Sequence, residues 1–254
     1  MRVNMKSDIE LRHILDLAEK SYRNNQYTFT DFLTTAQTAD FYSSLSELPP
    51  CGYEIFGGYE GADRNMIRFG KMEDLGYEEP FPIVCLRIEP LIDKFADALS
   101  HRDVLGSIMN LGMEREKLGD ILIKNNRIWV MCEPALSDVI QRELTRIKHT
   151  SIKCCVEESL PEDLEPHYET LEIQAASERI DGIVSKLCKL SRNASSELFA
   201  DGKVAINGRE MKNHSYLIKE NDVISVRGHG KYRYLGVKGT TRKGNQIILI
   251  DRFV

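Results

Sequence analysis

The chain has no long apolar run and no paired-cysteine motif. None of its 254 residues lies in a segment approaching the roughly 18–20 apolar residues of a membrane helix, and residues 1–10 lack the apolar stretch of a secretory signal. The six cysteines form no CxxC pair, and a disulfide between the adjacent Cys154 and Cys155 would be strained. We therefore expect a cytoplasmic protein with reduced cysteines, no membrane partner and no metal site.

Local signatures of catalysis are also absent. No GxGxxG follows a predicted strand, and no metal-ligand cluster or Ser/His/Asp signature is present. Residues 101–103 (HRD) match the kinase tripeptide without the asparagine that must follow it, and residues 239–245 lack the lysine of a phosphate-binding loop. Residues 179–182 (RIDG) resemble the catalytic Arg-Leu-Asp of pseudouridine synthases, but no matching catalytic domain follows. We expect no catalytic residues and no cofactor.

Charge is divided unevenly along the chain. The net charge is −5, yet residues 173–254 carry 15 basic and 8 acidic residues, while residues 1–172 carry 19 basic and 31 acidic residues. The C-terminal segment is therefore at +7 and the remainder at −12. A positive field at one end favours encounter with a polyanion, although basic residues can also form only a solvated face.

The predicted fold class is α+β, with a small α+β domain over residues 1–76. Apolar residues at helical spacing predict a helix around residues 9–18, and a second helical run starts at Thr30. Residues 53–70 are typical of two short strands around a glycine-rich turn.

Residues 77–157 are predicted to form a ferredoxin-like, RRM-like domain with the element order β-α-β-β-α-β. Ser100 can cap the first helix with Asp103 reciprocating, and Asn125-Asn126 suits a tight hairpin. RRM domains stack bases on aromatic side chains of their central strands, and here only Trp129 could do so. We do not expect base stacking to be the main activity of this domain.

The acidic, proline-containing residues 158–172 predict a linker to a basic domain over residues 173–254. In that domain Ser177 can cap a first helix that contains Arg179, and Ser191 can cap a second. Asn207-Gly208 is a strong signal for a hairpin.

Residues 179–226 resemble the S4 RNA-binding domain, through RID, SR, LFADGKVAING and YLIKENDVISV. The resemblance implies an RNA face lined by Arg179, Ser191, Arg192, Lys203, Asn207 and Gly208, with Asp181 holding an arginine in place. The chemistry agrees with it, because a helix N-terminus and a guanidinium together bind phosphate. The sequence departs from the family at Asn221, where glycine commonly precedes the aspartate, and at Gly182 in the first helix.

The whole chain resembles the bacterial YlmH family, through GGYEGADRNM, residues 95–123 and KGTTRKGN. The resemblance implies a monomeric, non-enzymatic factor that binds ribosomal RNA and tRNA on the large ribosomal subunit. Its expected role is ribosome-associated quality control of stalled nascent chains, with a protein quality-control factor on the same subunit as a further partner.

Two alternatives stay open. S4 domains are often appended to RNA-modifying enzymes, so the chain could be of the pseudouridine synthase or methyltransferase type. The genomic setting of the YlmH family also suggests an adaptor in cell division.

Overall fold

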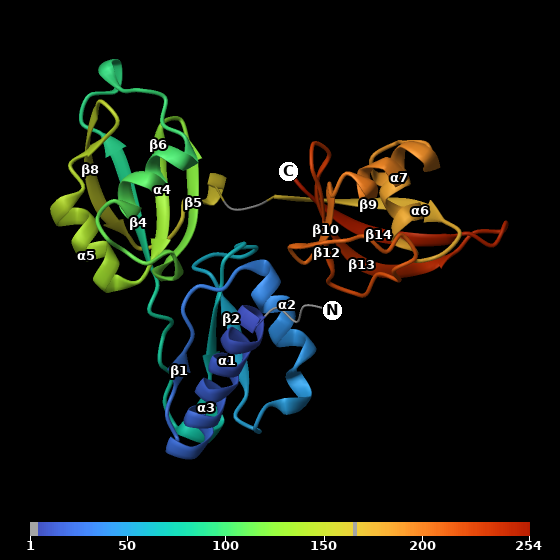
Figure 1. The fold of residues 1–254 in the computed structure, drawn as a ribbon, viewed down its shortest axis with the longest axis horizontal. Coiled ribbons are helices and arrows are strands. Elements are labelled where there is room, and N and C mark those ends of the chain that lie inside the picture. Colours follow the sequence, from blue (N-terminus) through green and yellow to red (C-terminus); the bar gives the residue numbers. More distant parts are fainter. Residues whose placement is uncertain (1–4, 165–166) are drawn as a thin grey trace. The chain divides into compact units, whose positions relative to one another are not determined.

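The computed structural model describes residues 5–164 and 167–254, which fall into two compact units, Met1–Glu165 and Pro166–Val254 (Figure 1). The α+β class is confirmed. Both predicted N-terminal domains lie in the first unit, and their separation at residue 76 stays a prediction. In the described ranges no helix is both long and apolar enough to cross a membrane.

The first unit contains a three-stranded and a five-stranded sheet, with order β1-β3-β2 and β5-β6-β4-β8-β7. Its elements in chain order are α1 (Met5–Asn24), β1 (Thr28–Phe29), α2 (Thr35–Ser43), η1 (Leu45–Glu47), β2 (Tyr53–Phe56), β3 (Met66–Phe69), α3 (Met72–Leu75), β4 (Val84–Pro90), η2 (Asp93–Phe95), α4 (His101–Met109), η3 (Arg115–Lys117), β5 (Leu118–Lys124), β6 (Arg127–Cys132), α5 (Pro134–Glu143), β7 (Arg146–Ile147), β8 (Thr150–Glu157) and η4 (Glu162–Leu164).

The N-terminal part packs α1 and α2 against the small sheet. Ile14 and Ala18 of α1 are buried with Phe41 of α2 and Phe69 of β3. The predicted helix start at Thr30 is wrong. The chain is extended up to residue 33 because it pairs with β3 and Asn65, and the capping box of Thr34 starts α2 at residue 35.

The predicted strand pair in residues 53–70 is confirmed as β2 and β3, which are antiparallel. Glycine is required in the connection between them. A Cβ on Gly57 would lie 2.4 Å from the carbonyl oxygen of Arg64, and Gly58 has φ +99° with its Cβ position 2.7 Å from Met131 Sδ. Both positions exclude a larger side chain, because backbone and core atoms already fill the space.

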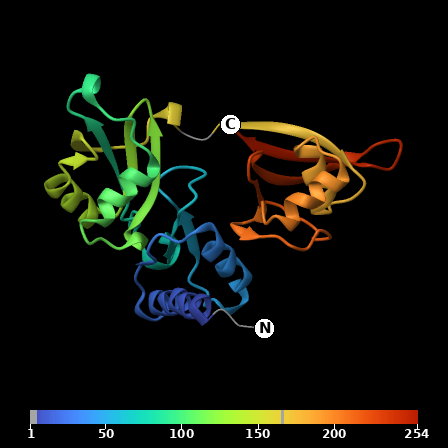
Figure 2. The same ribbon diagram turned by 45° about the horizontal axis from the view of Figure 1, so that its top comes forward.

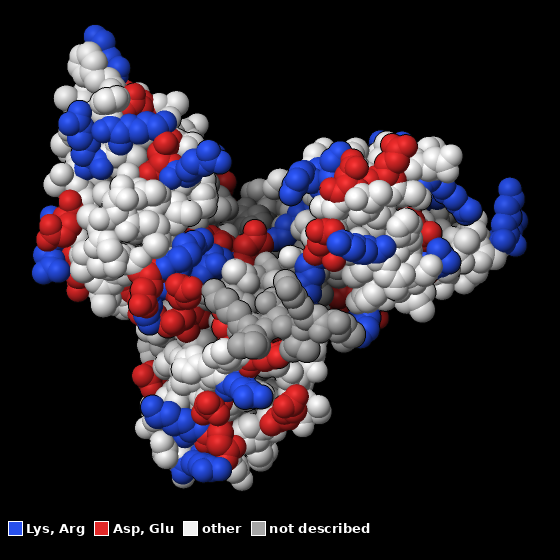
Figure 3. Space-filling model, viewed as in Figure 1, with Lys and Arg blue, Asp and Glu red and all other residues white. Residues whose placement is uncertain are grey.

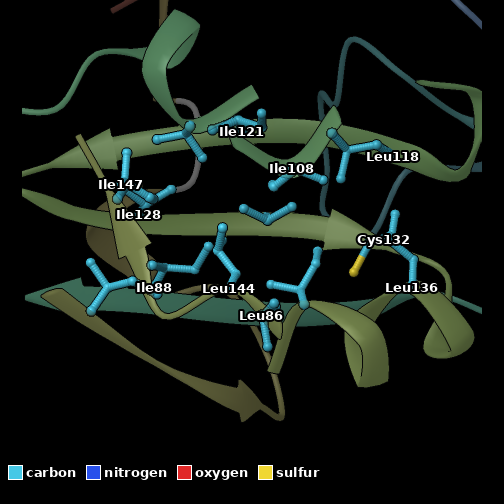
Figure 4. Close-up of a cluster of buried hydrophobic side chains, with 14 of the residues drawn as sticks. Leu86, Ile88, Ile108, Leu118, Ile121, Ile128, Cys132, Leu136, Leu144 and Ile147 are labelled. Carbon is cyan, nitrogen blue, oxygen red and sulfur yellow. The ribbon is translucent and has the colours of Figure 1, made fainter. Parts of the chain in front are cut away.

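The β-α-β-β-α-β order of the five-stranded sheet is confirmed as β4-α4-β5-β6-α5-β8. The Asn125-Asn126 hairpin is also confirmed, with φ of 50° and 59° at the two residues. Both helices cover one face of the sheet, and Figure 4 shows the apolar side chains between them. These include Leu86 and Ile88 of β4, Ile128 of β6, Ile108 of α4 and Leu136 of α5.

The start of α4 provides a test by pH. Asp103 accepts a hydrogen bond from the Ser100 N–H at 2.9 Å and pairs with Lys148 Nζ at 2.6 Å. The Lys148 bond first, and then the Ser100 bonds, lower the pKa of Asp103 from its usual 3.8 to about 2. A depressed folded pKa means that the carboxylate stabilises the fold above its unfolded pKa, and that this contribution is lost as pH falls toward about 2.

We therefore expect the stability of the wild-type chain against urea to fall more between about pH 5 and pH 2 than the stability of Asp103→Asn. The midpoints of both proteins, measured by circular dichroism across this range, check the prediction. Parallel pH dependences would contradict it.

The second unit is a six-stranded antiparallel sheet, with order β11-β10-β12-β13-β14-β9, on which α6 and α7 pack (Figure 1 and Figure 2). Its elements are β9 (Tyr168–Ala175), α6 (Ile180–Leu187), α7 (Arg192–Ala200), β10 (Val204–Ile206), β11 (Arg209–Glu210), β12 (Val223–Val226), β13 (Gly230–Thr240) and β14 (Gln246–Phe253).

The predicted linker 158–172 needs correction at its C-terminal end. Residues 168–172 belong to β9, which pairs with β14 from Tyr168↔Phe253 to Ala175↔Gln246. The sequence predicts a linker here because exposed positions of the strand include Glu169 and Glu172, which make the segment acidic. Its inward residues join the core of the unit only because the strand pairs with the C-terminal strand.

Candidate nucleic-acid interface

Arg179 lies at the N-cap of α6, with φ −73° and ψ 133°. The predicted first helix is confirmed as α6, but its predicted start is wrong, because Ser177 does not cap it and Arg179 precedes it. The chain stays extended through Arg179 because this residue bridges Leu217, and the N–H of Ile180 donates to the carbonyl of Tyr216 at 2.9 Å. Helix α6 begins only after this pairing ends.

Asp181 holds the Arg179 guanidinium in a two-point contact. Arg179 Nη2 donates to Oδ2 at 2.8 Å and Nε donates to Oδ1 at 3.2 Å. This contact is the main cause that raises the pKa of Arg179 and lowers the pKa of Asp181. The guanidinium is thus fixed in direction while its side chain stays 46% exposed.

Ser191 caps α7 as predicted, since its Oγ accepts a hydrogen bond from the N–H of Ala194 at 3.3 Å. Arg192 is the exposed first residue of the helix, and no acidic side chain lies in the first turn. In the described parts of the chain Arg192 has no ion-pair partner. Ser195 Oγ donates to the Asp181 carbonyl at 3.3 Å and links the first turns of α6 and α7.

Lys203 lies next to a second cation, Arg227, at the adjacent ends of two neighbouring strands, and the sequence did not single Arg227 out. Lys203 precedes β10 and pairs with Asp201 at 2.8 Å. Its carbonyl accepts a hydrogen bond from the N–H of Arg227, just beyond β12, at 2.9 Å. Arg227 is exposed. Sequence spacing could not identify it, because the residues lie 24 positions apart and only strand pairing brings them together.

The Asn207-Gly208 hairpin is confirmed, with φ of 49° and 75°. Asn207 Nδ2 donates to Asp222 at 2.7 Å, and its Oδ1 accepts from the N–H of Val223 at 2.8 Å. The amide therefore anchors the turn to β12, and Gly208 is its exposed member. The RNA contact of Asn207 stays a prediction.

The two departures from the S4 pattern are tolerated for local reasons. Asn221 adopts φ 68°, the left-handed conformation that glycine would take, and asparagine accepts it better than most residues. A Cβ on Gly182 would meet no atom within 4 Å, so glycine is not required there.

The RRM-like sheet does not offer its second face for base stacking. Trp129 is only 7% exposed, because Phe32, Tyr59 and Met66 from the N-terminal part cover it together with Leu160. The aromatic ring that could have stacked a base is thus part of the core.

The rest of this sheet face is an ion-pair cluster. The Glu89 carboxylate forms ion pairs with Lys153 at 2.9 Å, Arg87 at 3.2 Å and Arg127 at 3.3 Å. The hydrogen bond from Lys153 is the largest cause that lowers the pKa of Glu89. Arg87 also pairs with Glu157 at 2.7 Å, so three cations surround two carboxylates on this face.

The family comparisons agree with the resemblance seen in the sequence. Residues 77–160 match the family model described as "Putative RNA-binding domain in YlmH". Over 239 residues the chain is 25% identical to the ribosome-associated protein quality control protein P2 of Bacillus subtilis (strain 168), in an alignment that covers 93% of this chain and 90% of that protein. Residues 77–160 therefore form a domain of the YlmH RNA-binding type, and the chain is similar to the Bacillus protein over most of its length. A solved structure, the cell division protein ylmH from Streptococcus pneumoniae, aligns at 19% identity with a TM-score of 0.48, over 62% of this chain and 94% of that chain.

The YlmH match covers the whole five-stranded sheet of the first unit, whereas the S4-like surface lies outside it. The GGYEGADRNM motif contacts this domain through Asp120. That carboxylate accepts hydrogen bonds from Tyr59 Oη at 2.8 Å and from the N–H groups of Asp63 at 2.7 Å and Arg64 at 3.2 Å. Within the described residues no cluster of three or more His, Cys, Asp or Glu could hold a metal ion.

Proposed function

We propose that this chain is a ribosome-associated RNA-binding factor of the YlmH family. It binds ribosomal RNA and tRNA on the large subunit through the S4-like surface of α6, α7 and the β10–β11 hairpin. It acts there as a monomer in ribosome-associated quality control of stalled nascent chains, beside a protein quality-control factor.

The observation that carries this proposal is the pair of helix starts. Arg179 is fixed by Asp181 at the start of α6, and Arg192 is free and exposed at the start of α7. The two cations lie at the N-termini of helices that the Ser195–Asp181 hydrogen bond holds together, and such an arrangement suits the phosphates of folded RNA. The name of the Bacillus relative and the RNA-binding description of the matched model support the same role.

We further propose that the chain does not modify the RNA it binds. Burial raises the pKa of Cys85, Cys154 and Cys188 to about 11 and that of Cys132 to about 12. These four thiols are neutral at physiological pH, which disfavours them as nucleophiles. Assay of ribosomes for modified bases after incubation with the purified chain tests this point, and a stoichiometric product would overturn it.

The double variant Arg179→Ala/Arg192→Ala is expected to weaken binding to large subunits that hold tRNA by about tenfold. It should also reduce the slope of log affinity against log salt by about 2, because two phosphate contacts are lost. Co-sedimentation at several salt concentrations measures both quantities.

Arg12→Ala/Lys20→Ala is the matched control, since it removes the same charge from exposed positions of α1. Equal binding by the two double variants would exclude the α6–α7 surface as the docking site.

A further inference from the structure

The C-terminal hairpin carries cations that the S4 pattern does not include. Residues 223–250 contain no acidic residue and six basic ones, namely Arg227, Lys231, Arg233, Lys238, Arg242 and Lys243. This stretch forms β12, the long β13 and most of β14. It is the longest part of the second unit without a compensating negative side chain of its own.

The three cations on β13 each contact a neighbouring side chain. Lys231 lies over the ring of Phe253 at 4.7 Å. Lys238 pairs with Glu172 on β9, and Arg233 lies over the rings of Tyr168 and Phe253 at 5.0 and 5.5 Å. The two cations at the tip, in contrast, have no such neighbour among the described residues. In the described ranges Arg242 and Lys243 have no hydrogen-bond or ion-pair partner, and both are exposed.

The tip itself is a defined turn. The N–H of Thr241 donates to the Asn245 carbonyl at 2.7 Å, the N–H of Gly244 donates to the Thr241 carbonyl at 2.9 Å, and Thr241 Oγ1 accepts from the N–H of Asn245 at 3.1 Å. Gly244 has φ +81°, which suits glycine. Pairing of β14 with β9 as far as Gln246↔Ala175 supports the base of the tip. The two cations are therefore presented on a pre-formed loop, which lowers the ordering entropy of binding.

The tip projects beyond α6 and α7 in Figure 1, and the same projecting end is blue in Figure 3. Residues 238–248 contain no aromatic side chain, so the tip cannot stack bases as single-strand binders do. Its chemistry suits phosphates alone. In an A-form helix the two strands approach closely across a deep, narrow major groove, where a tip with two adjacent cations meets phosphates of both strands.

We propose that the β13–β14 tip, through Arg242 and Lys243, is a second RNA contact that binds the phosphate backbone of helical RNA. This inference rests on the proposed function, since it assumes that the chain binds RNA. It adds a contact outside the α6–α7 surface and specifies a duplex region as the ligand.

Arg242→Ala/Lys243→Ala in the full chain tests this contact. Fluorescence anisotropy with a labelled RNA stem-loop, and with a single strand of the same length, measures affinity against salt. We expect about tenfold weaker binding of the stem-loop and a salt slope reduced by about 2, with a much smaller change for the single strand. Circular dichroism should be unchanged, because both side chains are exposed and form no hydrogen bond or ion pair within the described residues.

Arg12→Ala/Lys20→Ala again supplies the control of equal charge, and Arg179→Ala/Arg192→Ala separates the two surfaces. If Arg179→Ala/Arg192→Ala weakens stem-loop binding while Arg242→Ala/Lys243→Ala binds as well as the Arg12→Ala/Lys20→Ala control, the tip contact is overturned and the proposed function stands. If the wild-type chain binds no RNA, both fail. An equal loss for stem-loop and single strand would overturn the assignment to helical RNA.

Discussion

Replacing Trp129 with alanine is expected to lower the free energy of unfolding of the first unit by about 3–5 kcal/mol. Trp129 is the single tryptophan of the chain and is 7% exposed in the cluster that joins the N-terminal part to the RRM-like sheet. Truncation removes a large apolar surface and leaves a cavity that Phe32 and Met66, both buried, cannot readily fill. Thermal and urea unfolding followed by far-ultraviolet circular dichroism measure the loss.

Val156→Ala on β8 is the matched control, because Val156 is 52% exposed on the same sheet and its truncation should change stability little. RNA binding by folded Trp129→Ala at low temperature distinguishes the structural role from base stacking. A variant that keeps its stability but loses RNA binding would show that Trp129 is a stacking residue, contrary to its burial.

Arg64→Ala is expected to lower the free energy of unfolding by about 2–3 kcal/mol. Arg64 Nη2 donates to the Phe32 carbonyl at 2.7 Å and Nε donates to the Leu118 carbonyl at 2.9 Å. Phe32 is almost fully buried, so the alanine variant leaves its carbonyl without this donor. The Leu118 carbonyl loses one side-chain donor and keeps the hydrogen bond from Arg115 Nη1. Burial is also the first cause that lowers the pKa of Arg64 to about 10, below its usual 12.5.

Urea unfolding of Arg64→Ala and Arg64→Lys separates geometry from charge. Lysine keeps the charge but lacks the planar fork that reaches both carbonyls, so it should restore only part of the stability. Arg142→Ala, at an exposed position of α5, is the control for loss of an arginine. A loss no larger than that of the control would contradict the structural role of the GGYEGADRNM motif.

Local features were predictable because their causes lie within a few residues. The Ser100 capping box, the Ser191 cap and the two asparagine-containing hairpins each depend on neighbouring side chains and on backbone angles that asparagine and glycine accept. The order of elements around the five-stranded sheet followed from alternating helical and strand periodicity, which is why its topology was predicted correctly.

The errors share a different cause. Arg179 is extended, and not helical, because it pairs with Leu217, which lies 38 residues further along the chain. Residues 168–172 form a strand because they pair with residues of β14 that lie 77 to 85 positions away in sequence. Neither partner can be read from the segment itself, since such pairing depends on the closing of long loops in the folded state.

For the candidate interface the same division applies. The sequence by itself determined the basic C-terminal segment, the Ser191-Arg192 helix start, the Asn207-Gly208 turn and the resemblance to YlmH, because these are properties of composition and short motifs. Only the tertiary structure decided that Asp181 fixes Arg179, that Arg227 joins Lys203, and that Trp129 is covered by the N-terminal part. These depend on which distant side chains are buried together, and that is set by packing of the whole unit.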